Sequence, residues 1–285
     1  MPTLFDFDTP PDQYAVMGNP IAHSKSPRIH ALFAQQTGQR LVYTAIQVDH
    51  GGFRQAVGNF QASGGKGLNV TVPFKREAWE LVNERSARAQ RAGAVNTIAF
   101  RADGALFGDN TDGIGLLRDI RENFHATIAG QRVLILGAGG AVRGVLGPLL
   151  EEQPALLVIA NRTADRASAL AREFAALGPV LGCGFDALPG QQFDLLINGT
   201  SASLQGDLPP LPGDLLTPGT FCYDLMYSAQ PTVFMHWAQQ RGAAQAVDGL
   251  GILVEQAAEA FFVWRGVRPH TASVIAQLRA EISKT

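Results

Sequence analysis

The sequence has little cysteine and no long apolar run. Cys183 and Cys222 are its only cysteines, which excludes a disulfide framework and favours a reducing compartment. No apolar stretch approaches the roughly 18 residues of a membrane-spanning helix. Residues 1–18 carry acids and a Pro pair where a signal peptide needs basic residues followed by an apolar run. We therefore expect a cytoplasmic protein with no membrane partner.

Charge is also scarce: Asp, Glu, Lys and Arg make up 17% of the chain, against roughly 25% in an average globular protein. The 23 basic and 25 acidic side chains leave a net charge of −2, which provides no basic face for nucleic acid. The 6 histidines and 2 cysteines show no spacing typical of metal ligands, so we expect no metal site.

What the sequence does have is length, apolar residues and glycine. Its 285 residues are about twice the common size of a single domain, so two domains are expected. Hydrophobic residues make up 46% of the chain, enough for packed cores. The 31 glycines exceed the typical share of roughly 7%, which suits an enzyme whose loops approach ligands closely.

Short apolar segments alternate with amphipathic helical segments in two blocks. The first block predicts strands at 14–18, 42–48 and 68–72, with helices from about Pro27 and Gly52. The second predicts strands at 132–137, 156–161, 193–198 and 221–226, with helices from Ala141 and Ala164. This alternation indicates βαβ units and parallel sheets, and hence an α/β fold.

Three further segments complete the outline. Residues 97–108 predict a β-hairpin that turns at Asp103-Gly104. Residues 206–219, rich in Pro and Gly, predict a long surface loop. Residues 250–266 and 271–282 predict helices that do not continue the alternation, so we expect them to return to the N-terminal domain.

A glycine-rich turn joins the strand at 132–137 to a helix, which is the position a dinucleotide phosphate site requires. Gly137 allows the tight turn, and Gly139 lets the backbone approach a pyrophosphate at the helix N-terminus. The third position of this fingerprint is Val142, where Gly or Ala is usual, so we expect the helix to stand slightly farther from its strand.

The residues that end the following strand indicate which nucleotide the site prefers. An NAD site normally ends this strand with Asp or Glu, which accepts hydrogen bonds from the ribose hydroxyls. Here the strand ends at Asn161-Arg162-Thr163, and Arg166 follows one helical step later. Two guanidiniums and a hydroxyl can bind a 2′-phosphate, whereas a carboxylate would repel it. The sequence therefore predicts NADP in preference to NAD.

Polar residues cluster at the predicted strand ends of the first block. Ser26 followed by Pro27 predicts a helix N-cap, and Ser24 adds a second hydroxyl, a combination suited to a carboxylate. Lys75 follows the third predicted strand, where the ligand crevice of an open α/β sheet lies. Residues 93–97 and 108–113 add neutral donors and acceptors and carboxylates. Such a set fits a small polyhydroxylated acid.

Together these motifs resemble the shikimate dehydrogenase family from end to end, within the wider group of shikimate/quinate dehydrogenases. The matching runs are GNPIAHSKSP (18–27), GGKGLNVTVPFK (64–75), AGAVNT (92–97), GDNTDG (108–113), GAGGA (137–141), NRT (161–163) with Arg166, and DGLGILVEQAA (248–258). The resemblance implies NADPH-dependent reduction of 3-dehydroshikimate to shikimate, on the route to chorismate and aromatic amino acids.

The resemblance also implies an architecture. It implies an N-terminal αβ substrate domain, a Rossmann-like NADP-binding domain and C-terminal helices that return to the first domain. The boundaries that follow are 1–112 with 250–285 for the substrate domain and 113–249 for the NADP domain. The partner it implies is a small-molecule substrate, and we expect a monomer or a homodimer.

The same resemblance assigns roles to individual residues. Lys75 and Asp112 would form the catalytic pair. The substrate-binding set would be Ser24, Ser26, Thr71, Asn96, Asp112, Tyr227 and Gln256. The NADP-binding set would be Gly137, Ala138, Gly139, Gly140, Ala141, Asn161, Arg162, Thr163, Arg166, Leu225 and Gly249. Leu225 stands where relatives often carry Met. Gly199 stands where relatives usually carry Ala, and we expect this glycine to loosen the backbone beside the nicotinamide.

Two alternatives stay open at this point. A quinate/shikimate dehydrogenase shares the substrate motifs but often accepts NAD, against which Arg162 and Arg166 argue. A shikimate-sensing module that has lost catalysis should lack Lys75, Asp112 or the glycine turn, and all three are present.

Overall fold

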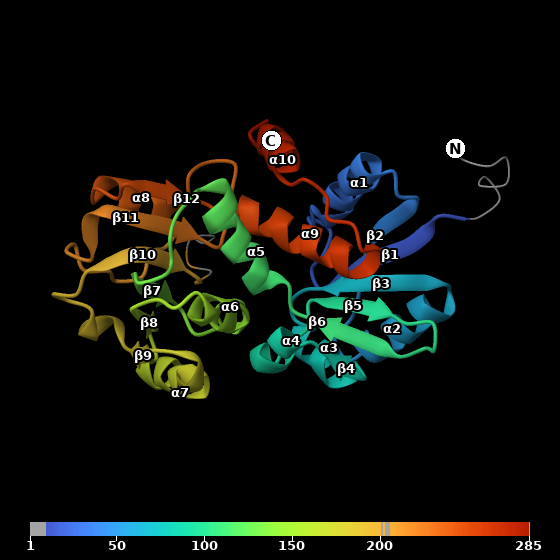
Figure 1. Ribbon diagram of the computed structural model, residues 1–285, viewed down its shortest axis with the longest axis horizontal. Helices are drawn as coiled ribbons and strands as arrows, with labels where there is room; N and C mark the ends of the chain where they lie inside the picture. The colour runs from blue at the N-terminus through green and yellow to red at the C-terminus, as the bar shows by residue number, and fades with distance from the viewer. Residues whose placement is uncertain (1–9, 201, 203–205, 285) are drawn as a thin grey trace. The chain divides into compact units, whose positions relative to one another are not determined.

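The computed structural model describes residues 10–200, 202 and 206–284 (Figure 1). The chain forms two compact units. The first contains the residues up to Thr111 together with Ala257–His270, and the second contains Asp112–Gln256 and the residues from Thr271 onward. These units differ from the functional division expected above at Asp112, 250–256 and 271–285. The boundaries of the substrate and NADP domains therefore stay a prediction.

The first unit is built on a six-stranded sheet in the order β2-β1-β3-β5-β6-β4. Strand β1 runs parallel to β2 and β3, while β5 is antiparallel to both β3 and β6. The predicted hairpin is therefore confirmed. The strands are β1 (Asp12–Gly18), β2 (Leu41–Gln47), β3 (Gly65–Val70), β4 (Glu84–Arg85), β5 (Thr97–Phe100) and β6 (Leu106–Asp109).

Four helices connect these strands: α1 (Ser26–Thr37), α2 (Phe53–Ala62), α3 (Lys75–Leu81) and α4 (Ala87–Ala92). Phe53 of α2 and Phe74, which precedes α3, are fully buried and stack with their ring centres 5.1 Å apart. They pack with Leu68 of β3 and Ile98 of β5 in one core on a face of the sheet. The apolar positions that predicted the strands thus become the core.

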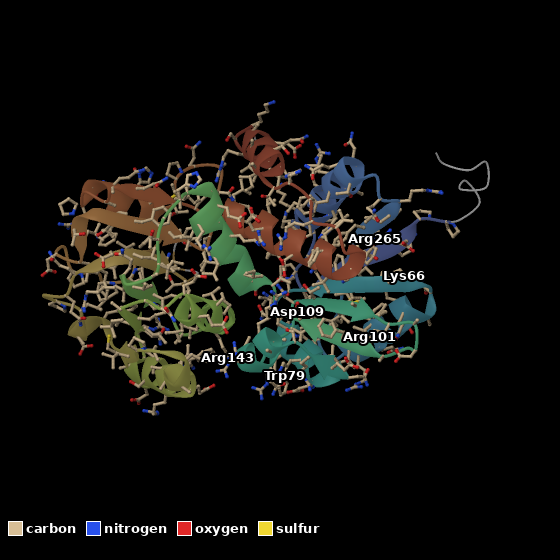
Figure 2. The ribbon with its side chains drawn as sticks, in the orientation of Figure 1. Lys66, Trp79, Arg101, Asp109, Arg143 and Arg265 are labelled. Carbon is tan, nitrogen blue, oxygen red and sulfur yellow. The ribbon has the colours of Figure 1, made fainter. Side chains whose placement is uncertain are left out.

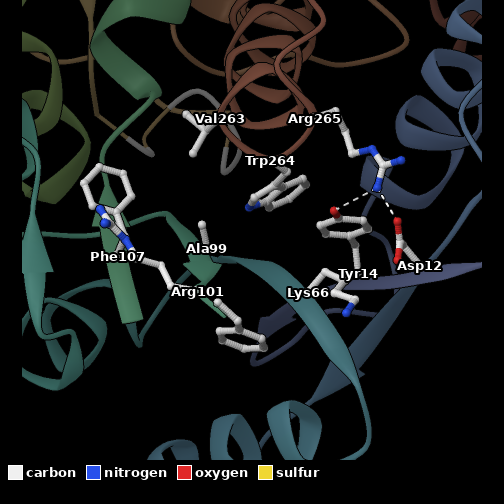
Figure 3. A pocket seen from close by; sticks show the side chains of 10 residues that line it. Asp12, Tyr14, Lys66, Ala99, Arg101, Phe107, Val263, Trp264 and Arg265 are labelled. Atoms are coloured by element: carbon white, nitrogen blue, oxygen red, sulfur yellow. Dashed lines mark hydrogen bonds and ion pairs between the residues drawn. The ribbon is translucent and has the colours of Figure 1, made fainter. Parts of the chain in front are cut away.

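The end of helix α9 (Leu250–Arg265) also belongs to the first unit (Figure 3). Trp264 stacks on Tyr14 of β1 with ring centres 4.7 Å apart and donates from Nε1 to the Ile98 carbonyl at 2.9 Å. The indole fits because Gly67 has no side chain: an added Cβ there would lie 2.6 Å from Trp264 Nε1. Figure 3 shows Arg265 directed at both Tyr14 and Asp12, with which it forms a hydrogen bond and an ion pair.

The second unit is a parallel six-stranded sheet in the order β12-β11-β10-β7-β8-β9. Its strands are β7 (Arg132–Leu136), β8 (Leu156–Ala160), β9 (Val180–Cys183), β10 (Phe193–Asn198), β11 (Leu216–Asp224) and β12 (Gln245–Val247). The first strand in sequence, β7, lies in the middle of the sheet, with β8 and β9 on one side and β10, β11 and β12 on the other. This is the doubly wound strand order of a dinucleotide-binding fold. The predicted α/β class is confirmed, and so is the Rossmann-like second unit.

The helices of the second unit are α5 (Asp112–Arg118), the π-helical turn η1 (Asp119–Asn123), α6 (Gly140–Glu151), α7 (Ala164–Phe174), α8 (Val233–Gln240) and α10 (Ala272–Ile282). Two short 3₁₀ turns, η2 (Ala175–Leu177) and η3 (Phe185–Ala187), flank β9. The sequence did not predict β9 or β12, which are edge strands of 4 and 3 residues. Strand β11 begins at Leu216, so the loop predicted over 206–219 is shorter than expected.

Candidate active site

In the first unit, the loops after β1 and β3 lie against each other. Thr71 N donates to the Met17 carbonyl at 2.9 Å, and Asn19 N donates to the Val72 carbonyl at 3.0 Å. Gly18 makes this approach possible, because an added Cβ would overlap the Thr71 methyl group. The loop that carries the two serines and the loop that carries Thr71 are therefore held side by side at one sheet edge.

The structure corrects the expected role of Ser26. This residue is not the N-cap of α1 but the first residue inside the helix, and its side chain is buried. Lys25 is the N-cap residue and makes no side-chain capping hydrogen bond, while Ser24 Oγ accepts from Ser26 N at 3.3 Å. Both hydroxyls still lie at the positive end of the dipole of a 12-residue helix that has no acidic residue in its first turn.

Lys75 and Asn96 lie on neighbouring segments at the same sheet edge. Lys75 is the half-buried first residue of α3, and its carbonyl accepts from Val95 N at 2.8 Å. Asn96 is buried, and its side-chain Oδ1 accepts from Thr111 N at 2.9 Å. The Asn96 backbone pairs with both Val70 and Asp109. The structure thus places Ser24, Ser26, Thr71, Lys75 and Asn96 on loops and helix starts that backbone hydrogen bonds join at one sheet edge.

Sequence reasoning assigned no individual role to three polar residues that hydrogen-bond near these loops, Tyr43, Asn69 and Thr97. Tyr43 donates to Asn69 Oδ1 at 2.7 Å, and Asn69 Nδ2 donates to the Asn96 carbonyl at 3.1 Å. Burial raises the pKa of Tyr43 well above its usual range, while a hydrogen bond with Ser26 acts in the opposite direction. The signal was present in the sequence, because Asn69 and Thr97 are polar residues that stand directly beside the apolar residues Leu68, Val70 and Ile98.

Asp109 is a structural carboxylate, although it lies in the same GDNTDG run as Asp112 (Figure 2). Arg88 pairs with it through two hydrogen bonds of 2.8 and 2.6 Å, and Ser86 also donates to it. Burial alone would raise the pKa of Asp109, but Arg88, Ser86 and the Asn110 amide together hold it below its usual value. The carboxylate oxygens of Asp109 thus accept hydrogen bonds from Arg88, Ser86 and the Asn110 amide within the first unit.

The glycine turn of the second unit forms as predicted. Gly137 has a φ of +101°, which favours glycine, and its N–H donates to the Ala160 carbonyl at 2.8 Å. Helix α6 starts at Gly140, and no described atom lies within 4 Å of an added Cβ on Gly139 or Gly140. The turn that also contains Ala138 and Ala141 is therefore open to a ligand at the helix N-terminus.

Val142 fills the third fingerprint position, and the expected wider spacing of α6 from its strand stays a prediction. Its side chain is fully buried in the core of the second unit and occupies the space beside Gly199. Gly199 N donates to the Leu136 carbonyl at 2.9 Å. The structure therefore gives Gly199 a packing role. Ser201, in the same run, lies outside the described residues.

The end of β8 presents polar and basic groups. Thr163 is the N-cap residue of α7, and Asn161 Nδ2 donates to its carbonyl at 3.0 Å. Arg162 and Arg166 are exposed, and neither forms an ion pair within the part of the chain that the structure covers. Two guanidiniums are thus available beside the end of β8, where the sequence predicts the 2′-phosphate.

The remaining predicted residues lie on three segments of the second unit. Asp112 is the first residue of α5. Leu225 is buried just after β11, and its carbonyl lies where an added Cβ on Gly249 would stand. Tyr227 is half-buried, which raises the pKa of its hydroxyl, and a nearby carboxylate, Asp248, raises it further. Gln256 lies on α9 and packs on Gly115 of α5.

The two halves of the predicted site thus belong to different units. Lys75 lies in the first unit and Asp112 in the second, so their pairing stays a prediction. Among the described residues, no group of three His, Cys, Asp or Glu side chains is arranged to hold a metal ion. No helix in the described ranges combines the length and apolarity needed to cross a membrane.

Comparison with known families matches three parts of the chain. Residues 16–98 match the shikimate dehydrogenase substrate binding domain. Residues 119–205 match the shikimate / quinate 5-dehydrogenase family, and residues 249–279 match the shikimate 5′-dehydrogenase C-terminal domain. These matches include most of the residues singled out above.

Individual relatives agree along almost the whole chain. The shikimate dehydrogenase (NADP(+)) of Methylococcus capsulatus is 61% identical over 273 residues, which are 96% of this chain and 98% of the relative. An Ael1 enzyme from Pseudomonas putida has a solved structure that is similar with a TM-score of 0.88 at 51% identity, covering 94% of this chain and 98% of that one. The shikimate 5-dehydrogenase of Thermus thermophilus, solved with NADP(H) and shikimate, gives a TM-score of 0.84 at 32% identity and covers 94% and 99%.

Proposed function

The chain belongs to the shikimate dehydrogenase family, and on that premise we propose that it catalyses the reversible NADPH-dependent reduction of 3-dehydroshikimate to shikimate. The observation that carries the proposal is that backbone hydrogen bonds join the segments that carry Ser24, Thr71, Lys75 and Asn96 at one sheet edge. A hydroxylated acid needs several fixed donors and acceptors, and these loops supply them.

The residues of the second unit fit NADP. The open glycine turn before α6 would hold the pyrophosphate at the helix N-terminus, and Arg162, Thr163 and Arg166 would hold the 2′-phosphate. Leu225 and Gly249 would also line the NADP site. When bound, NADPH supplies a hydride to the substrate ketone. In the domain scheme of the family, residues 113–249 would form the NADP domain, and 1–112 with 250–285 the substrate domain.

The substrate carboxylate is assigned to the N-terminus of α1. Ser24 and Ser26 provide two hydroxyls, and the helix dipole favours a negative charge there. Tyr227 would donate from the second unit. The ring hydroxyls are assigned to Thr71, Asn96, Asp112 and Gln256. The hydrogen bonds that fix the Asn96 amide orient it before substrate arrives.

Lys75 is assigned the proton transfer. An ammonium group close to the ketone oxygen can deliver the proton that the developing alkoxide requires, and its charge stabilises the oxyanion. Asp112 would accept a hydrogen bond from a substrate hydroxyl and fix the position of the ammonium. We expect the position of the Lys75 ammonium to decide its contribution to catalysis.

The two alternatives make different demands. An enzyme that uses NAD would require that Arg162 and Arg166 not determine the preference for NADP over NAD. A sensing module would bind shikimate without turnover.

A cytoplasmic location and a monomeric or homodimeric state belong to the same proposal. Light scattering on the purified protein tests the oligomeric state.

Product identification tests the proposal. The purified protein is incubated with 3-dehydroshikimate and NADPH, and the product is identified by chromatography and mass spectrometry. The proposal requires one shikimate formed for each NADPH oxidised. Binding of 3-dehydroshikimate without turnover would support the sensing module instead.

A further inference from the structure

Helices α5 and α9 pack closely in the second unit because glycines stand at both contacts. An added Cβ on Gly115 of α5 would lie 2.7 Å from Gln256 N, and one on Gly251 of α9 would overlap the Asp119 carboxylate. Asp112, Gly115 and Asp119 are spaced three and four residues apart on α5 and its continuation η1, so they share one face. The proposed catalytic carboxyl and the two contacts therefore lie on the same side of one helical segment.

The hydroxyl of Tyr223 joins the two helices to the sheet. Tyr223 is fully buried on β11, donates to Asp119 Oδ2 at 2.5 Å and accepts from Ile252 N at 3.2 Å. Ile252 N is one of the N–H groups that the first turn of α9 cannot pair within the helix. Since Gln256 follows Ile252 by four residues, it stands one turn farther along the same helix face.

Asn123 and Glu255 extend this connection. Asn123 Nδ2 donates to Asp119 Oδ1 at 2.8 Å and to Glu255 Oε1 at 3.1 Å. Thr271, which precedes α10, donates to the same Glu255 oxygen at 2.5 Å. The start of α9 is thus tied to η1, β11 and the start of α10 by side chains that are buried or half-buried.

We propose that Tyr223 and Asp119 are positioning residues for substrate binding, which hold the first turn of α9 against α5 so that Gln256 keeps a fixed place relative to Asp112. The inference rests on the proposed function, because it treats Gln256 and Asp112 as substrate ligands. Neither Tyr223 nor Asp119 is assigned a contact with the substrate or with NADP.

The effect of losing the Tyr223 hydroxyl follows from these contacts. Ile252 N and Asp119 Oδ2 would each lose a partner, and the first turn of α9 would keep the hydrogen bond from Leu250 N to Asp248 at 3.2 Å. A less restrained first turn lets Gln256 shift, which weakens substrate binding. Lys75 lies in the first unit, so we expect the chemical step to change less.

A double-mutant cycle between Tyr223→Phe and Gln256→Ala tests the inference by steady-state kinetics with shikimate and NADP. Tyr223→Phe should lower kcat/KM for shikimate about tenfold, mainly through KM. In the Gln256→Ala background the same change should lower kcat/KM less than about twofold, because a residue that acts through Gln256 has nothing left to position. Tyr14→Phe removes another buried tyrosine hydroxyl, in the first unit, and is the matched control.

Asp119→Asn is the second variant. It should also lower kcat/KM for shikimate in the wild-type background, and it should lower it much less in the Gln256→Ala background. Equal effects of Tyr223→Phe in both backgrounds, or an unchanged KM, would overturn the positioning role. Turnover by the wild-type enzyme is measured first. An inactive wild type overturns the proposed function, whereas an active wild type with additive effects overturns only this inference.

Discussion

The Val142 side chain packs directly against Gly199 in the second unit and occupies the place that a Gly199 side chain would take. An added Cβ on Gly199 would overlap Val142 Cγ2 and lie 3.0 Å from the Leu136 carbonyl oxygen. Val142 is larger than the Gly or Ala usual at the third position of the phosphate-binding turn, and the missing side chain at Gly199 makes room for it. Two departures from the common pattern, far apart in sequence, thus compensate each other in the core beside the proposed cofactor site.

Gly199→Ala should therefore destabilise the protein. Valine has little rotational freedom to move away, so we expect a loss of about 1–3 kcal/mol in the free energy of unfolding, measured by urea denaturation. Adding Val142→Ala should recover part of this loss, because the two changes act on one space.

A control for the substitution itself is available at Gly58. This residue lies inside α2, and no described atom stands within 4 Å of an added Cβ. Gly58→Ala should leave stability unchanged or raise it by up to about 1 kcal/mol. Equal losses at both glycines would show that Val142 is not the cause.

Lys75→Ala should lower kcat by a factor on the order of 10² or more, with a modest change in KM, because the proton donor and the charge near the oxyanion are both lost. Lys66→Ala, at an exposed lysine of β3, is the control and should leave kcat unchanged. A Lys75 variant within about tenfold of the wild-type kcat would remove this residue from proton transfer.

Ser24→Ala should mainly raise KM for shikimate, because the carboxylate takes no part in the reaction. The same change removes the hydrogen bond to Ser26 N, so a loss of about 0.5–1.5 kcal/mol in unfolding free energy should accompany it. Kinetics and thermal melts on one sample separate the two effects. A fall in kcat with KM unchanged would contradict the carboxylate assignment.

Asp119 should make stability depend on pH. Burial raises its pKa to about 6; Tyr223 and Asn123 donate hydrogen bonds that lower it, and the Glu255 and Asp248 carboxylates raise it. The pKa of an aspartate in the unfolded chain is about 3.9. The folded form therefore binds a proton more tightly, and stability falls as the pH rises from about 4 to about 6.

The comparison with Asp119→Asn isolates this carboxyl. Relative to the variant, the wild-type unfolding free energy should decrease by roughly 2–3 kcal/mol across that interval and stay level above it. Arg279 pairs with Asp248 in both proteins, so its contribution should cancel. A difference between the two proteins that does not change with pH would show that Asp119 titrates normally.

Much of this architecture could be predicted because the local signals agree with one another. The buried strands of each unit are apolar runs bounded by glycine or polar residues, and Gly137 with the open turn before α6 follows directly from the sequence. The edge strands β9 and β12 were missed since 4- and 3-residue segments carry too little pattern.

The site was predicted less completely, because its contacts join distant residues. Nothing local indicates that Lys25 rather than Ser26 is the N-cap residue of α1, or that Arg88 pairs with Asp109 and so leaves Asp112 as the candidate of that run. The contacts of Gly199 with Val142 and of Gly251 with Asp119 depend on how elements pack. Such partners are visible only once the fold is known.

The most direct test of the account is the initial rate followed by nicotinamide absorbance, with shikimate and quinate each crossed against NADP and NAD. We predict that shikimate with NADP exceeds the other three combinations by about tenfold or more, and that replacing Arg162 and Arg166 together by Ala removes the preference for NADP. Equal or faster rates with quinate or with NAD would contradict the assignment of an NADP-dependent shikimate dehydrogenase and the role of the two arginines.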